Sequence, residues 1–156
     1  MVRIYVDADS CPVKDEVYRV AKRYDLEVTV VAGAWLRIPS EPSIHLEVVE
    51  ETGGLDAADD WIVERAADGD IVITDDIILA SKCLERGCTV ISTRGKTFRA
   101  DSIGDALANR ELMASLREVG AITGGPSAFT KADRSRFLQQ LDNAVNAQKR
   151  RTKPTG

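Results

Sequence analysis

Short apolar runs alternate along the chain with segments whose apolar residues recur at helical spacing. Four runs rich in valine and isoleucine predict buried strands, at residues 3–6, 28–32, 71–74 and 89–92. The stretch 44–49 alternates apolar and polar side chains, which predicts a strand with one wetter face. Helical periodicity and glycine or proline boundaries predict helices at residues 12–24, 56–67, 77–86, 101–119 and 130–148. This alternation favours a three-layer α/β fold, in which helices flank a mostly parallel sheet of about five strands.

The length and composition indicate one ordinary globular domain. The chain has 156 residues, of which 44% are hydrophobic and 29% charged, as in soluble proteins of domain size. We expect the domain to span 1–148 and a basic flexible tail to follow at 149–156. No apolar run approaches the ~20 residues of a membrane span, and Asp7 interrupts the N-terminal run. We therefore expect a cytoplasmic protein with no membrane partner and no signal peptide.

The cysteines and the histidine exclude some metal and hydrolytic chemistry. Cys11, Cys83 and Cys88 lack the spacing of a zinc site, so we expect small buried side chains rather than ligands. His45 is the only histidine, which excludes a site built from several histidines. No G-x-S-x-G motif is present. The sequence therefore predicts neither a zinc site nor acyl transfer by a Ser-His-Asp triad.

Aspartates gather where predicted strands end. Asp7 and Asp9 follow the first strand, and Asp75 and Asp76 follow the run 71–74. Because ligands of parallel α/β sheets bind beyond the carboxyl ends of the strands, these carboxylates converge if the two strands are neighbours. Converging carboxylates repel one another unless a hard cation neutralises them. The pattern therefore predicts a Mg²⁺ or Mn²⁺ site suited to chemistry on phosphates.

A third group of aspartates begins the helix 56–67, where Asp56, Asp59 and Asp60 share one face. For this group alone, helix capping and the helix dipole are the better explanation. Asp76 has a similar alternative role as the cap of helix 77–86. Asp7 has none, because it closes a buried strand, where an unpaired carboxylate is costly. The candidate metal ligands are Asp7, Asp9, Asp59, Asp60, Asp75 and Asp76.

Basic side chains concentrate in the second half of the chain. Residues 1–80 hold 18 acidic and 7 basic side chains (net −11), whereas residues 81–156 hold 7 acidic and 14 basic side chains (net +7). This division predicts that the two halves contact different partners, although folding can equally interleave them into a neutral surface. Basic side chains after the last predicted strand and on the last helix could hold phosphates. Trp35, in a loop, could stack on a base, but we expect a partly buried anchor. The candidate substrate-binding residues, for which a solvated surface is the alternative role, are Arg94, Lys96, Lys131, Arg134 and Arg136.

The chain resembles the bacterial YaiI/YqxD family from Arg3 to about Val145. The resemblance rests on four stretches in order: V-D-A-D-S-C-P-V-K-D-E-V, D-A-A-D-D-W-I, D-I-V-I-T-D-D-I-I-L-A and G-G-P…F-T-K-A-D-R-S-R-F. It implies a distant similarity to PIN-like domains, which are metal-dependent nucleases with a parallel sheet and an acidic site, but no demonstrated activity. By this resemblance the site acids correspond to Asp7 with Asp9, to Asp59 or Asp60, and to Asp75 with Asp76.

These observations favour a ribonuclease that depends on Mg²⁺ or Mn²⁺, with RNA as the expected partner. Its catalytic residues would be Asp7, Asp9, Asp60 and Asp75. One alternative is a phosphatase of the haloacid-dehalogenase type, with Asp7 as the nucleophile and Asp9 as the acid, although no lysine lies between Arg23 and Asp75. The other is a non-catalytic RNA-binding module. The sequence leaves the oligomeric state open.

Overall fold

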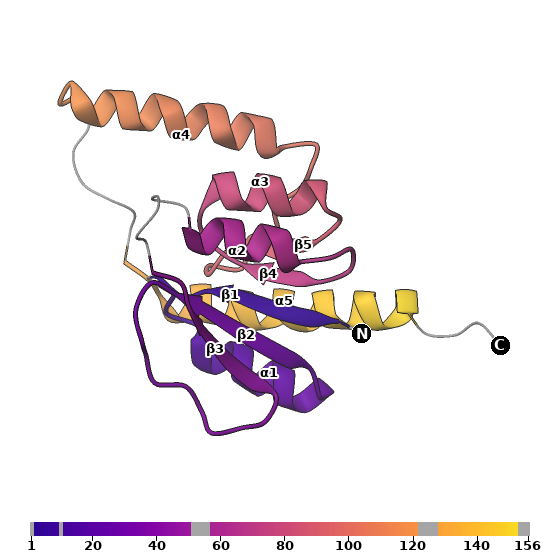
Figure 1. The fold of residues 1–156 in the computed structure, drawn as a ribbon. Coiled ribbons are helices and arrows are strands. Elements are labelled where there is room, and N and C mark those ends of the chain that lie inside the picture. Colours follow the sequence, from indigo (N-terminus) through magenta and orange to yellow (C-terminus); the bar gives the residue numbers. More distant parts are fainter. Residues whose placement is uncertain (1, 10, 51–56, 122–127, 153–156) are drawn as a thin grey trace.

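The computed structural model describes residues 2–9, 11–50, 57–121 and 128–152, and a five-stranded sheet forms its centre (Figure 1). The strands are β1 (Arg3–Asp7), β2 (Glu27–Ala32), β3 (Ile44–Val48), β4 (Ile71–Ile73) and β5 (Thr89–Ile91). All neighbouring strands are parallel, in the order β3-β2-β1-β4-β5. The expected α/β fold is confirmed, and its sheet is wholly rather than mostly parallel.

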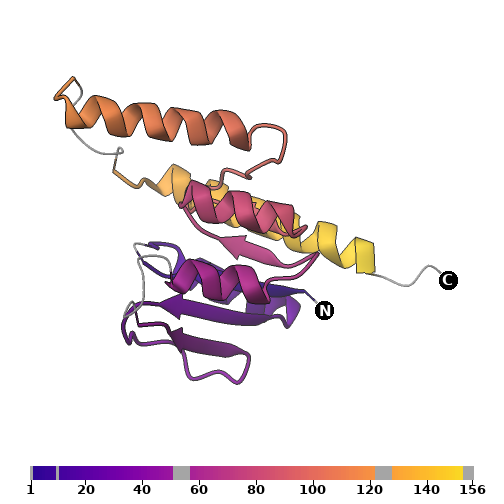
Figure 2. The same ribbon diagram turned by 45° about the horizontal axis from the view of Figure 1, so that its top comes forward.

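The order of the strands explains which face each helix covers. The helices of the described residues are α1 (Lys14–Tyr24), α2 (Ala57–Arg65), α3 (Ile77–Glu85), α4 (Ile103–Glu118) and α5 (Lys131–Thr152). The connection from β1 to β2 runs one way along the sheet, whereas those from β3 to β4 and from β4 to β5 run the other way. Because such crossovers are right-handed, α1 lies on one face and α2 and α3 lie on the opposite face. α5 packs beside α1, which completes three layers (Figures 1 and 2).

Two apolar layers fill the space between the sheet and its helices. Successive residues of a strand face opposite sides of the sheet, so β1 contributes to both layers. Ile4 and Val6 face α1 and α5, where Phe137 is fully buried. Tyr5 faces α2 and α3, where Leu79 is fully buried. This burial on both faces is why the strands are nearly continuous apolar runs.

α4 differs from the other helices because it covers neither face of the sheet. It lies beside α3 (Figures 1 and 2), and none of its residues is buried. Leu112 on this helix and Val119 just after it are 55% and 77% exposed. We call the end of the sheet where the strands finish the carboxyl edge. A pocket lies there between the strand ends and α4.

The start of α1 differs from the one expected. α1 begins at Lys14 rather than at residue 12, and its N-cap, Val13, makes no side-chain capping bond. Asp56, with which the sequence predicted the next helix to begin, lies outside the described residues.

α5 continues past 148, where the sequence predicted a tail. Its last turns make tertiary contacts that hold them. The Lys149 ammonium lies 5.1 Å from the centre of the Tyr24 ring, and Arg151 pairs with Asp68 at 3.1 Å. Neither α5, at 22 residues, nor any other described helix combines the length and apolar character that crossing a membrane requires.

Trp35 is 76% exposed, so the expectation of a partly buried anchor is wrong. Its neighbours Leu36 and Ile38 pack against the core and fill that role instead. The loop 33–43 is therefore anchored on either side of position 37, and the indole of Trp35 faces solvent.

Candidate functional site

The order in which the chain adds strands to the sheet changes side between β1 and β4. β2 and β3 are added on one side of β1, and β4 and β5 on the other. In open α/β sheets the crevice at the carboxyl edge of such a switch point is where ligands bind. β1 ends there at Asp7, and β4 is followed there by Thr74, Asp75 and Asp76. The condition set by the sequence, that the two strands are neighbours, is therefore met, and both aspartate groups lie at the same edge of the sheet.

A threonine links the ends of the two strands. The Thr74 hydroxyl donates a hydrogen bond to Asp7 Oδ2 at 2.8 Å and accepts one from the Asp76 backbone N–H at 3.0 Å. Thr74 is buried, and Asp7 is half-buried. Burial raises the pKa of Asp7, and the nearby charges of Asp9 and Asp76 raise it further. The carboxylate that had no structural explanation in the sequence thus lies in an environment that disfavours its charged form.

The two aspartates after β4 have different partners. Asp75 accepts hydrogen bonds from the Thr93 backbone N–H at 2.8 Å and from the Thr93 hydroxyl at 2.7 Å. Asp76 is the N-cap of α3, and its Oδ1 accepts from the N–H groups of Ile78 and Leu79. The capping role weighed for Asp76 is therefore present, and Asp75 ties the end of β4 to the end of β5.

The acids of α2 are placed differently. Asp60 is exposed, and Asp59 is half-buried near Cys83 of α3. The pKa of the Cys83 thiol is raised mainly by its hydrogen bond with Cys88 and by burial, with a further contribution from the charge of Asp59. Within the described ranges, no three His, Cys, Asp or Glu side chains form a group that could hold a metal ion. The acids of α2 and those of the strand ends do not form such a group there.

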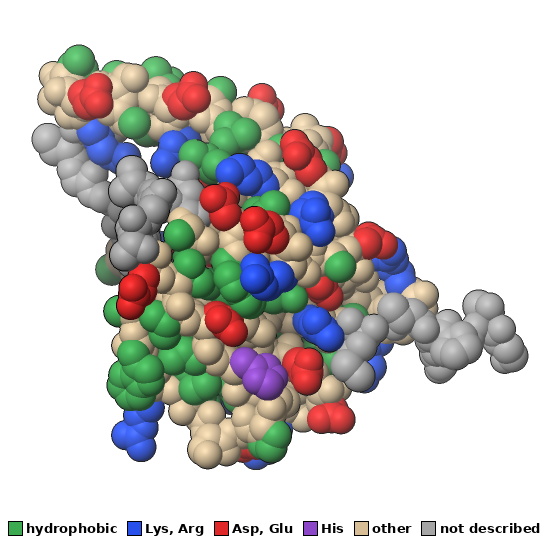
Figure 3. All heavy atoms as spheres, viewed as in Figure 1, with side chains coloured by type: hydrophobic (Ala, Val, Ile, Leu, Met, Phe, Trp, Pro, Cys, Tyr) green, Lys and Arg blue, Asp and Glu red, His purple; other side chains and the backbone are tan. Residues whose placement is uncertain are grey.

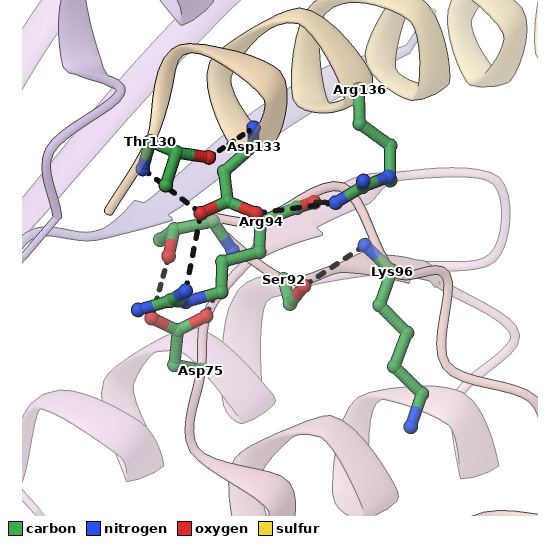
Figure 4. A network of polar contacts seen from close by, with 8 residues as sticks. Asp75, Ser92, Arg94, Lys96, Thr130, Asp133 and Arg136 are labelled. Atoms are coloured by element: carbon green, nitrogen blue, oxygen red, sulfur yellow. Dashed lines mark hydrogen bonds and ion pairs between the residues drawn. The ribbon is translucent and has the colours of Figure 1, made fainter. Parts of the chain in front are cut away.

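Two of the candidate substrate-binding arginines share one carboxylate, as Figure 4 shows. Arg94, after β5, pairs with Asp133 Oδ2 at 3.1 Å, and Arg136 pairs with Asp133 Oδ1 at 3.2 Å. Asp133 and Thr130 also form a capping box, because the side chain of each accepts a hydrogen bond from the backbone N–H of the other. The bond from the Thr130 N–H, with smaller contributions from the Thr130 hydroxyl, Arg94 and Arg136, lowers the pKa of Asp133. This network fixes the segment after β5 against the start of α5.

Arg134 has a structural partner, whereas Lys131 is exposed. Arg134 Nη1 lies 2.6 Å from Glu16 Oε1, and the Glu16 side chain is only 6% exposed. The guanidinium also lies 5.2 Å from the centre of the Phe129 ring. Lys96 is exposed, and its backbone N–H donates to the Ser92 hydroxyl at 3.0 Å. The structure therefore gives Arg94, Arg134 and Arg136 acidic partners within the fold.

Replacing Arg134 by alanine is expected to lower the free energy of unfolding by about 2 kcal/mol, because a buried Glu16 carboxylate would lose its partner while water reaches the half-exposed site. Chemical denaturation measures this loss. Lys131→Ala is the matched control, since it removes a charge from the same turn without a buried partner, and we expect a change within about 0.5 kcal/mol. Equal losses in the two variants would contradict the structural role of Arg134.

A pocket of about 770 Å³ opens beside these groups, between the strand ends and α4. Asp75 and Asp76 form one part of its wall, Ser92 and Thr93 another, and α4 contributes arginines. Figure 3 shows basic side chains on the side of α4 that faces the rest of the molecule. The complete lining is Pro12, Asp75, Asp76, Ile77, Ser92, Thr93, Arg94, Arg110, Arg117 and Phe129.

Arg110 and Arg117 are not among the residues that the sequence predicted for the site. They are seven residues apart, which places them two turns apart on the same side of a helix, and this spacing was the available signal. Thr74 and Thr93 were also missed as partners of the aspartates. Nothing local marks a threonine as the donor to a carboxylate 67 residues away.

Comparison with known proteins gives a family but no activity. A family model described as "Uncharacterized BCR, YaiI/YqxD family" matches residues 5–147. A UPF0178 protein of Rhodopseudomonas palustris (strain TIE-1) is 56% identical over 156 residues, which cover 99% of this chain and 98% of that protein. A UPF0178 protein of Paramagnetospirillum magneticum is 57% identical over 150 residues, covering 96% and 98% of the two chains. A UPF0178 protein of Nitrobacter winogradskyi is 55% identical over 144 residues, covering 92% and 90%.

Proposed function

The chain belongs to the YaiI/YqxD family, and we propose that it is a divalent-metal-dependent phosphodiesterase that acts on RNA at the carboxyl edge of the sheet. The observation that carries this proposal is the pocket itself. The pocket brings carboxylates at the switch point together with arginines of α4. Cleavage of RNA requires both, because basic side chains bind its phosphates and acidic side chains hold the metal ion that assists the reaction.

The donor set fits a cation that binds together with a phosphate. Mg²⁺ is usually held by one or two carboxylates, with waters and substrate phosphate oxygens completing its shell. Asp9 and Asp76 lie close enough to Asp7 for their charges to raise its pKa. A bound cation would relieve this repulsion between carboxylates. A resident ion held by protein ligands alone would need three or more ligands, and none of the described residues form that group.

Each part of the pocket has a role in this proposal. When bound, Mg²⁺ or Mn²⁺ supplies an activated water and stabilises charge on the leaving oxygen. Asp7 lies behind the pocket wall, hydrogen-bonded to the residue that precedes Asp75; burial raises its pKa, which favours a role as proton acceptor, and Thr74 fixes its orientation. Asp75 holds Thr93 at the pocket wall. Arg110 and Arg117 bind the phosphates on either side of the cleaved bond.

Cleavage of a labelled single-stranded RNA, with Mn²⁺ or with a chelator, tests the proposal. We expect cleavage with the ion and none without it. The same assay on an aryl phosphate separates the alternatives, because a haloacid-dehalogenase-type phosphatase would hydrolyse that monoester. RNA binding without turnover under any metal condition would contradict the proposal and favour a binding module.

Replacing both Arg110 and Arg117 by alanine is expected to weaken RNA binding and its dependence on salt. Each phosphate contact on a single strand contributes about 0.7 to the slope of log K against log salt, so we expect the slope to fall by about 1.4. Fluorescence anisotropy over a salt series measures it. The variant with Arg19 and Arg150 replaced makes the same change in charge on α1 and α5 and should keep the slope. Equal slopes in both variants would show that α4 does not contact the RNA.

A further inference from the structure

β3 forms an open edge of the sheet. It pairs with β2 on one side only. At the opposite end of the sheet, the segment after β5 turns back and covers that strand, with a bridge between Ile91 and Thr97 and a bond from the Phe98 N–H to the Val90 carbonyl at 2.9 Å. Within the described residues, β3 is thus the strand whose outer edge can template another strand.

The register of β3 shows which backbone groups face outward. The Ser43 carbonyl accepts from Val28 N–H at 2.9 Å, and the Val49 N–H donates to the Ala32 carbonyl at 2.8 Å, so the odd-numbered residues point toward β2. Since this direction alternates along a strand, the backbone groups of Ile44, Leu46 and Val48 point outward. The Ile44 N–H bonds to the Glu41 carbonyl in the preceding turn at 3.1 Å. The Leu46 and Val48 N–H groups and three carbonyls therefore face the open edge.

The sequence of β3, Ile-His-Leu-Glu-Val, is complementary to itself when two copies run antiparallel and centre on Leu46. Ile44 then lies opposite Val48 of a second copy, and His45 lies opposite Glu47. Leu46 meets Leu46 as a hydrogen-bonded pair, because its backbone groups point outward. The pair of His45 and Glu47 is then the non-hydrogen-bonded kind, in which side chains approach most closely.

On both faces of β3, side chains of the same kind come together when two copies pair in this way. Ile44 and Leu46 pack at the margin of the core that α1 covers, and Val48 is 40% exposed, so an apolar row continues from one copy to the other. His45 is half-exposed on the opposite face, with its Nε2 3.9 Å from Glu27 Oε1. Figure 3 shows this single histidine at the surface with acidic side chains on both sides.

We propose that the chain forms a twofold dimer in which the β3 strands of two copies pair antiparallel and make one continuous sheet. The partner is a second copy of this chain, because the imidazole donor of His45 facing the carboxylate acceptor of Glu47, together with the outward backbone groups, is complementary to itself in one register. The two pockets then lie at opposite ends of the joined sheet, so the dimer is independent of the proposed function.

Sedimentation over a concentration series tests the association. The native chain is expected to move from 17.0 kDa toward twice that mass as concentration rises. His45→Glu places two like-charged pairs in the interface, and we expect the dimer to dissociate about tenfold more readily. Exchanging the charges, with His45→Glu and Glu47→Lys together, should restore association. Thermal unfolding of each variant shows that it is folded, and a native chain that stays monomeric throughout would overturn the proposal.

A cross-link tests the register. Cys11, Cys83 and Cys88 are buried, so cysteines introduced at the edge react selectively. A mixture of the His45→Cys and Glu47→Cys chains should form a disulfide-linked dimer under mild oxidation, because these positions lie opposite each other. Either variant alone should link much less. Equal cross-linking of the mixture and of the single variants would reject this pairing.

Discussion

Replacing Asp7 by asparagine is expected to reduce metal-dependent RNA cleavage at least 100-fold, the lower range for a positioned acid or base. The asparagine oxygen can still accept the Thr74 hydrogen bond, so the geometry of the strand ends is kept while the charge and the basicity are lost. Single-turnover cleavage of labelled RNA with saturating Mn²⁺ measures the effect. A variant that cleaves at the native rate would remove Asp7 from the reaction.

Asp25→Asn is the matched control for this variant. Asp25 ends α1 with a φ of 55°, a conformation that asparagine adopts readily, and it lies at the opposite end of the sheet from Asp7. The same chemical change there should leave cleavage unchanged. A parallel loss in both variants would indicate that the assay reports net charge rather than the site.

The Asp7→Asn variant is also expected to be more stable than the native chain at neutral pH. Burial raises the pKa of Asp7, so the folded chain holds this proton more tightly than the unfolded chain, and the ionised carboxylate costs stability at neutral pH. The cost disappears as the pH falls from the raised pKa toward the ordinary value of 3.8. Thermal unfolding of both chains across that window should show curves that converge at low pH. A less stable variant at neutral pH would contradict this account.

Replacing Gly95 by alanine is expected to lower the free energy of unfolding by about 3 kcal/mol, the sum of left-handed backbone strain and overpacking. Gly95 has a φ of 85°, and a Cβ there would lie 2.6 Å from the Arg136 carbonyl carbon and from the Phe137 nitrogen. Neither backbone atom can move without shifting α5, whose Phe137 is fully buried. Urea denaturation measures the loss, and cleavage should fall as well, because Thr93 and Arg94 precede this turn.

Gly104→Ala provides the contrasting control. Gly104 lies in the first turn of α4, and a Cβ there meets no atom within 4 Å. Because alanine favours a helix more than glycine does, this variant should gain up to about 0.5–1 kcal/mol. The same substitution therefore has opposite signs at the two sites. A stabilising Gly95→Ala would show that the turn after β5 can move away from α5.

The sequence by itself determined the strands and helices of this protein and the edge of the sheet at which the aspartates gather. The valine and isoleucine runs are strands because such runs suit burial on both faces. Asp7 closes one of them, where the sequence predicted that a carboxylate is costly, and burial raises the pKa of this group in the structure. The capping box of Thr130 and Asp133 is likewise encoded locally, because its two partners are three residues apart.

Tertiary structure alone decided which side chains meet. The strand order places Thr74 against Asp7 across 67 residues, and helix packing places Arg134 against Glu16 across 118. It also turned Arg94 and Arg136 toward Asp133 and brought Arg110 and Arg117 to the pocket. Periodicity and capping are encoded within three or four neighbouring residues, whereas these pairings depend on how whole strands and helices are ordered. The sequence therefore fixes where carboxylates end strands, and only the packed fold determines what each one contacts.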